Sequence, residues 1–224
     1  MNRSVTSTSG HRRTTASAPN ENPCEPSRES GDGDGSGSTR AVRMAVFTAL
    51  LLLGLIADLT SKEFVFDRMG LPGQSDPAWL IDGIFGVQTA VNPGAVFGLG
   101  AGKGLVFATF SIFAITGIIL WMLRFQAYQS RWLTVTLGLI SGGILGNLYD
   151  RLGFWWADHL PLEWKSGVRD WILFRLEGVP FFDPWPNFNI ADALLVLGAA
   201  MLFYQSLVLE NRNEQEESES SIMK

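Results

Sequence analysis

The chain has 224 residues, of which 46% are hydrophobic and 17% charged, and its formal net charge is −5 at pH 7. The charges gather near both ends while long internal windows carry none, a distribution typical of a one-domain membrane protein with polar tails rather than a soluble globule. No dense basic stripe is present, which argues against nucleic acid as a partner.

The first forty positions, residues 1–40, are rich in Ser, Thr, Gly, Pro and charged residues and include the run Gly31–Gly35. Such a segment cannot bury an apolar core, so we expect a disordered tail. It has no apolar central region and is therefore not a signal peptide.

Four apolar segments follow, each close to the roughly 20 residues that a membrane-spanning helix needs. The shorter ones could be buried core helices instead, but four such segments in a chain of this size favour spans. We therefore expect an all-α membrane domain over residues 41–209, followed by a disordered acidic tail over 210–224. The segments are Ala41–Leu59, Gly104–Leu123, Trp132–Tyr149 and Ala193–Leu209.

Two long polar segments, roughly 60–103 and 150–192, separate these spans, together with one short segment, 124–131. The first long segment contains a strand-like stretch, Ile84–Val91, followed by the turn residues Asn92-Pro93-Gly94. This pattern predicts a small sheet or hairpin at the membrane surface.

Four spans place both long segments on one face of the membrane, and both tails and the short segment on the other. The short segment carries Arg124 and Arg131 without an acid, and Arg40 and Arg43 flank the first span. The positive-inside rule then puts this side in the cytoplasm and the long segments outside it.

Polar clusters gather on the face with the long segments, where ionisable residues at span ends are costly and often functional. Each has a simpler explanation: Asp58 and Lys62 could be a helix-end ion pair of little consequence, Asn147 could bond a neighbouring helix, and Asp150 could mark the interface. Together on one face they favour a single shared site. The clusters are Asp58–Lys62, Asn92–Gly98, Gly142–Arg151, Val168–Ile172 and Asn187–Asp192.

The residue inventory narrows the chemistry of such a site. One cysteine, Cys24, excludes an internal disulfide and a Cys-rich zinc site, and two histidines, of which only His159 lies outside the tail, argue against a His-based metal site or triad. Ser61 and Lys62 are adjacent and would not face each other on a helix, so they are badly placed to act as a catalytic Ser-Lys dyad. Aspartates remain, and two held close share a proton and can hydrolyse a peptide bond without metal or covalent intermediate.

The ordered motif series over about residues 41–209 resembles that of bacterial lipoprotein signal peptidases, the signal peptidase II family. It comprises Asp58…Lys62, Asn92-x-Gly94-Ala95-x-Phe97-Gly98, Gly146-Asn147-Leu148-Tyr149-Asp150-Arg151, Val168-x-Asp170 and Phe188-Asn189-x-Ala191-Asp192.

This resemblance implies a membrane aspartic endopeptidase with the catalytic pair Asp170 and Asp192, using neither cofactor nor metal. The implied fold is four transmembrane helices with a small β-cradle on the outer face. The implied substrate is a diacylglyceryl-modified prolipoprotein, cut before its lipidated lipobox cysteine. The residues that it implies for substrate and site support are Asp58, Lys62, Asn92, Gly94, Asn147, Asp150, Arg151, Asn189 and Ala191.

The implied location is the bacterial cytoplasmic (inner) membrane, with several spans and the active site on the periplasmic face. We expect a monomer whose partners are its substrate and membrane lipid. The chain departs from the family pattern at Val96, where a second alanine is common, at Ser61, where threonine is frequent, and in the long connection 152–169. Two alternatives stay open: an ion- or proton-coupled transporter and a non-catalytic membrane subunit.

Overall fold

The computed structural model describes residues 34–94, 102–180, 182–183 and 185–222, and it describes side chains between 37 and 208 within these ranges. Its elements alternate long helices with short strands. In chain order they are α1 (Asp34–Met69), β1 (Ala78–Ile81), β2 (Phe85–Asn92), α2 (Gly104–Arg124), η2 (Ala127–Gln129), α3 (Arg131–Arg151), η3 (Leu162–Trp164), β3 (Val168–Phe174) and α4 (Ile190–Ile222).

Among the described residues, four helices are long and apolar enough to cross a membrane. They are α1 from Gly37, α2, α3 and α4 as far as Val208. The first three contain the apolar segments picked out from the sequence, and the fourth covers all of its segment except Leu209. The prediction of four spanning helices with a small sheet is confirmed at this level.

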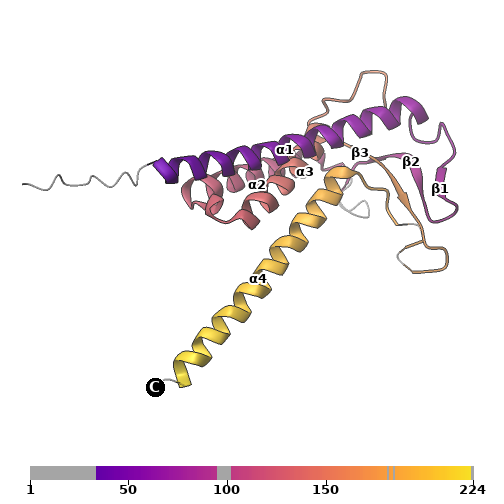
Figure 1. Ribbon diagram of the computed structural model, residues 1–224. Helices are drawn as coiled ribbons and strands as arrows, with labels where there is room; N and C mark the ends of the chain where they lie inside the picture. Colours follow the sequence, from indigo (N-terminus) through magenta and orange to yellow (C-terminus); the bar gives the residue numbers. More distant parts are fainter. Residues whose placement is uncertain (1–33, 95–101, 181, 184, 223–224) are drawn as a thin grey trace, which may run out of the picture.

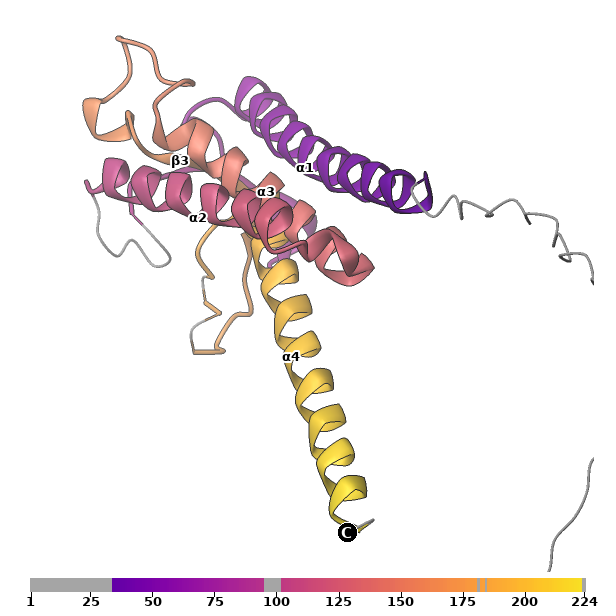
Figure 2. The ribbon, with the colours of Figure 1, turned by 90° about the vertical axis from the view of Figure 1, so that its left-hand side faces the viewer.

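Helix α3 is the centre of the fold. It packs against α1, α2 and α4, and 56% of its most apolar window is buried, compared with 11–17% in the other three helices. Figure 1 shows α1, α2 and α3 side by side, and Figure 2 shows α4 leaving this group obliquely toward the C-terminus. The site described below lies at the end of α3 where α4 begins.

Glycines on α3 bring its backbone close to its neighbours. A Cβ at Gly142 would lie 3.0 Å from the carbonyl oxygen of Leu51 and 3.1 Å from the Cα of Gly54. On another face of α3, a Cβ at Gly143 would lie 2.6 Å from the carbonyl oxygen of Ala191 at the start of α4. Small residues at such positions let membrane helices pack closely, and here they bring polar groups of α1, α3 and α4 together.

The three strands form an antiparallel sheet in the order β1-β2-β3 within the described part of the chain. It lies at the end of the helices where α1 ends and α4 begins (Figure 1). The β2–β3 register pairs Val87 with Ile172 and Ala90 with Asp170, so β2 carries an extra residue at this point. A bulge of this kind bends a strand and changes the direction of side chains beside it. The predicted small sheet is thus present, and its third strand carries Asp170.

Two helix boundaries differ from the sequence-based expectation. Helix α1 continues to Met69 instead of ending near Leu59, because the polar residues Asp58 and Lys62 are buried in ion pairs and do not interrupt it. Helical structure also covers 34–40 and 210–222, where we expected disorder. Adding residues to an existing helix is far easier than starting one, and the Glu and Gln residues after 210 are good helix formers. Residues 1–33 lie outside the described part.

Candidate active site

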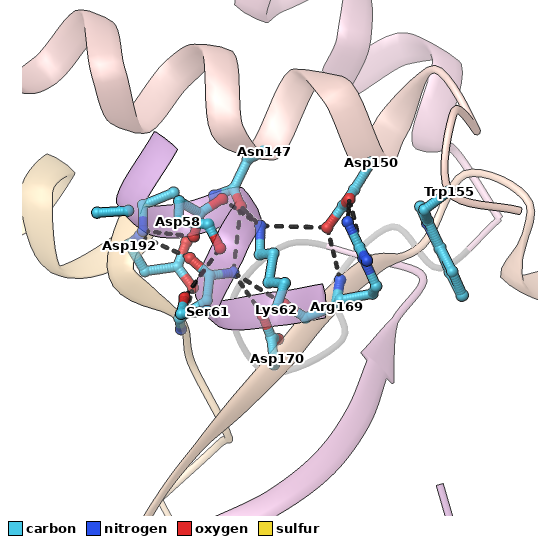
Figure 3. A network of polar contacts seen from close by, with 12 residues as sticks. Asp58, Ser61, Lys62, Asn147, Asp150, Trp155, Arg169, Asp170 and Asp192 are labelled. Atoms are coloured by element: carbon cyan, nitrogen blue, oxygen red, sulfur yellow. Dashed lines mark hydrogen bonds and ion pairs between the residues drawn. The ribbon is translucent and has the colours of Figure 1, made fainter. Parts of the chain in front are cut away.

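A buried lysine connects α1 to α3. The Nζ atom of Lys62 lies 2.6 Å from Oδ2 of Asp58 and 3.1 Å from Oδ2 of Asp150, and it donates to Oδ1 of Asn147 at 3.1 Å. The amide oxygen of Asn147 accepts one N–H of the ammonium, and the two carboxylates compensate its charge. The side chains of Lys62, Asp58 and Asp150 have no exposed surface, and α1 continues to Met69, so the pair does not lie at a helix end. Figure 3 shows the cluster.

Two amide side chains connect this cluster to the pair of acids. Nδ2 of Asn147 donates to Oδ1 of Asp192 at 2.8 Å, and Nδ2 of Asn189 donates to Oδ1 of Asp170 at 2.7 Å. Asn189 also donates to Oδ1 of Asn147 at 3.1 Å. Each carboxylate is therefore held by its own amide, and the two amides hold each other.

The start of α4 explains the Asn189-x-Ala191-Asp192 motif in physical terms. Oδ1 of Asn189 accepts from the backbone N–H of Asp192 at 2.9 Å, while Oδ2 of Asp192 accepts from the backbone N–H of Asn189 at 3.3 Å. This reciprocal arrangement is a capping box. The backbone N–H of Ala191, which has no partner within the helix, donates to Oδ1 of Asp58 at 2.9 Å. The helix start is thus fixed to α1, and it orients Asp192.

Backbone pairing places Asp170 beside this helix start. The Ile172 N–H donates to the carbonyl oxygen of Phe188 at 2.8 Å, and the Phe188 N–H donates back at 3.1 Å. The residue that precedes Asn189 is therefore paired to β3 two positions after Asp170. Asp170 is 2% exposed. Burial raises the pKa of its carboxyl to about 8, and the Asp192 carboxylate adds to the rise, while Lys62 and the amides of Asn189 and Asn92 oppose it.

Arg151 fixes the loop after β2. Its Nη1 donates to the carbonyl oxygens of Asn92, at 3.1 Å, and Ser166, at 3.0 Å, and its Nη2 donates to that of Gly94. Its guanidinium lies 5.3 Å from the centre of the Phe107 ring. Oδ1 of Asn92 accepts from the Gly94 N–H at 3.0 Å, which closes a tight turn. Arg151 thus joins the end of α3 to both loops around the site.

Both acids line one cavity of about 910 Å³. Its polar end is formed by Asp170, Asp192, Asn147, Arg151 and Asn92. The rest is apolar and lies between α2 and α4, lined among others by Phe107, Phe110, Leu195, Val196 and Ala200. Large, mainly apolar cavities with a few convergent polar groups are the usual form of a binding site.

The structure brings all of the candidate site residues together. Asp58, Lys62, Asn147, Asp150, Arg151, Asn92, Gly94, Asn189, Ala191 and the acids Asp170 and Asp192 are joined by the contacts given above. Ser61 donates its hydroxyl to the backbone carbonyl oxygen of Asp58 at 2.9 Å and does not join them. Among the described residues, no group of three or more His, Cys, Asp or Glu side chains is placed to bind one metal ion.

Arg169 was missed as a site residue. Alternation along a strand predicts only that its side chain lies on the face opposite to that of Asp170. It is 3% exposed and pairs with Asp150. The one available signal was its position beside Asp170 in the strand Val168–Phe174, whose remaining residues are apolar and where an unpaired charge would be costly.

Comparison with known proteins gives one consistent result. The model of a protein family described as "Signal peptidase (SPase) II" matches residues 50–208. A protein of Rhodopirellula baltica named "Lipoprotein signal peptidase" is 58% identical over 166 residues, which are 74% of this chain and 73% of the relative. One of the same name from Bacillus subtilis is 31% identical over 172 residues, covering 77% of this chain and 99% of the relative.

Solved structures agree on the fold. A structure described as a bacterial membrane enzyme superposes with a TM-score of 0.58 at 21% identity, covering 77% of this chain and 91% of the other. A second structure with the same description has a TM-score of 0.54 at 20% identity, covering 75% and 93%.

Proposed function

The chain belongs to the signal peptidase II family, and on this premise we propose that it is an aspartic endopeptidase that removes signal peptides from prolipoproteins with Asp170 and Asp192. The observation that carries the proposal is the placement of both carboxylates, each held by its own amide, in the wall of one cavity. Two carboxylates in one site cannot both ionise cheaply, so the pair keeps one proton near neutral pH.

The difference in burial between the two acids supports a different role for each. Asp170 is almost fully buried and Asp192 is half-buried, and the pKa of the Asp170 carboxyl is raised to about 8. The proton therefore resides on Asp170, which donates it to the carbonyl oxygen of the scissile bond. Asp192 carries the charge and takes a proton from the attacking water. No covalent intermediate forms and no cofactor takes part.

The shape of the cavity supports a substrate with both a peptide and a lipid portion. Its polar end can hold the extended peptide across the two acids. Its apolar portion between α2 and α4 can hold acyl chains, because such chains are most stable against apolar side chains such as Phe110 and Leu195. We assign the substrate as a diacylglyceryl-modified prolipoprotein, cut before the lipidated cysteine.

The positions of the arginines support an orientation in the membrane. Helix α2 ends at Arg124 and α3 begins at Arg131, at the end opposite to the site. If these residues face the cytoplasm, the sheet and the site lie on the periplasmic face of the inner membrane, where exported prolipoproteins arrive. We propose that the functional unit is a monomer.

The test is cleavage by the purified protein in phospholipid vesicles. The substrates are a synthetic lipobox peptide with diacylglycerol on its cysteine and the same peptide without it. We expect the first peptide to be cut before the cysteine and the second to remain intact. Cleavage of neither, by protein that is folded and inserted, would contradict the proposal and would favour a transporter or a non-catalytic subunit.

A further inference from the structure

Arg169, the residue before Asp170, holds both oxygens of one buried carboxylate. Its backbone N–H donates to Oδ2 of Asp150 at 2.9 Å, and its Nε and Nη2 donate to Oδ1 at 3.2 and 3.0 Å. Figure 3 shows these contacts between Arg169 and Asp150 beside Asp170. Because Asp150 lies in the last turn of α3, these bonds fix the start of β3 to the central helix.

The same carboxylate is also bound to Lys62, at 3.1 Å. A chain of alternating charges therefore runs from Arg169 on β3, through Asp150 on α3, to Lys62 and Asp58 on α1. The carbonyl oxygen of Arg169 accepts from Nδ2 of Asn189 at 3.4 Å, and this is the amide that donates to Asp170. The position of Arg169 thus determines where both Asp170 and its amide partner lie.

The long connection 152–167 contributes to this arrangement through Trp155. The guanidinium of Arg169 lies 5.4 Å from the Trp155 ring centre and 6.0 Å from that of Phe66. Nε1 of Trp155 donates to the carbonyl oxygen of Gly167 at 3.0 Å, and Nη1 of Arg169 pairs with Glu63 at 2.9 Å. Only a planar, forked cation can stack on rings and hold a carboxylate by two N–H groups, so lysine cannot replace these contacts fully.

Arg169 also balances the buried charge. The buried cations around the site are Lys62, Arg151 and Arg169, and the buried anions are Asp58 and Asp150. With one proton on the Asp170–Asp192 pair, the pair supplies the third negative charge and the cluster is neutral. Glu63 is 69% exposed, and water screens its charge. Loss of Arg169 would leave one negative charge uncompensated near the acids.

The charged groups that face Asp170 come from three elements: Asp192 from α4, Lys62 from α1 and Arg151 from α3. Lys62 interacts electrostatically with Asp170 and also forms an ion pair with Asp150. Without Arg169, Asp150 would attract Lys62 more strongly and would add its own field, so a proton on the acids would become harder to remove.

We propose that Arg169 is a positioning residue of the peptidase, which fixes Asp170 through Asp150 and keeps the buried site neutral. This inference rests on the proposed function, since its readout is the cleavage reaction. It gives the connection 152–167, which joins α3 to β3, the role of holding the guanidinium through Trp155.

The experiment compares Arg169→Gln, Arg169→Lys and the control Arg175→Gln for cleavage of the diacylglyceryl lipobox peptide across pH. Arg175 lies just after the same strand, and its side chain pairs with Asp183 near the surface. We expect Arg169→Gln to lower kcat on the order of 100-fold with little change in KM. We also expect the alkaline limb of the pH–rate profile to move to higher pH by roughly half a pH unit. Arg169→Lys keeps the charge, so the limb stays in place while kcat falls roughly 10-fold.

Folding is checked separately by thermal unfolding in detergent. Arg175→Gln should match wild type in every readout. Full kcat in Arg169→Lys would overturn the proposal even if Arg169→Gln does not fold. An equal loss of kcat in both variants without movement of the limb would also overturn it, because a merely structural role predicts that result. An inactive wild-type protein would instead overturn the proposed function.

Discussion

Replacing Asp170 by asparagine should stabilise the folded protein at neutral pH while removing its activity. Asparagine resembles the protonated acid: it can still accept from Nδ2 of Asn189, as Oδ1 of Asp170 does at 2.7 Å. It has no ionised form, so the folded state no longer has to keep a buried proton that the unfolded chain would release.

The magnitude follows from the pKa. The Asp170 pKa rises from 3.8 in the unfolded chain to about 8 in the folded one. Between these values the folded state binds a proton that the unfolded state has lost, so wild-type stability falls as pH rises, by about 1.4 kcal/mol per unit. The decline is absent below pH 3.8 and levels off above about 8. At pH 7 the variant should therefore be more stable by about 4 kcal/mol.

The assay is thermal unfolding in detergent micelles, followed by tryptophan fluorescence at pH 5.5 and 7.5. The difference in unfolding free energy between Asp170→Asn and wild type should increase by about 3 kcal/mol between these pH values. This increase corresponds to roughly 6–12 °C in Tm for a chain of this size. Asp158→Asn, an exposed change in the long connection, should stay within about 0.5 kcal/mol of wild type. An Asp170→Asn protein no more stable than wild type at pH 7.5, or a gap that does not widen, would refute the reasoning.

Two further predictions concern pH and helix packing. The alkaline limb of kcat/KM should follow the loss of the Asp170 proton, with an apparent pKa of about 8; a limb that stays flat to pH 10 would place the essential proton elsewhere. Gly146→Ala should lower Tm and activity together, because the added Cβ would collide with the Asp58 carboxylate and displace the start of α4. Gly117→Ala on α2 should be neutral or slightly stabilising, because nothing lies within 4 Å of its Cβ; equal losses in the two glycine variants would contradict the packing explanation.

The spans and the candidate acids were predictable from the sequence for different reasons. Uninterrupted apolar runs such as Gly104–Leu123 have the length and the apolar composition that a helix needs to span a bilayer. Elimination of other chemistry favoured a pair of aspartates, and the resemblance of the motifs implied that the pair is Asp170 and Asp192. The capping box of Asn189 and Asp192 is a local feature of the kind that spacing along a helix can reveal.

Other features depend on contacts between distant segments and could not be read along the chain. Asp58 and Lys62 looked like the end of a span, yet α1 continues through them because α3 supplies Asp150 and Asn147 as partners. Arg169 was not singled out, because alternation along a strand says nothing about the helix α3, whose Asp150 binds it. The extension of α4 past residue 210 follows from a helix that has already begun.

The catalytic assignment can be tested most directly by single-turnover cleavage of the diacylglyceryl lipobox peptide by Asp170→Asn, Asp192→Asn and the control Asp158→Asn. All three are to be compared at pH 7 in the same vesicles, at matched amounts of folded protein. We expect Asp158→Asn to cleave like wild type. Both dyad variants should cleave on the order of 10⁴-fold more slowly or worse, since each lacks one of the two carboxyl groups that transfer protons. Near-wild-type cleavage by either Asp170→Asn or Asp192→Asn would contradict the assignment of these two acids as the catalytic pair.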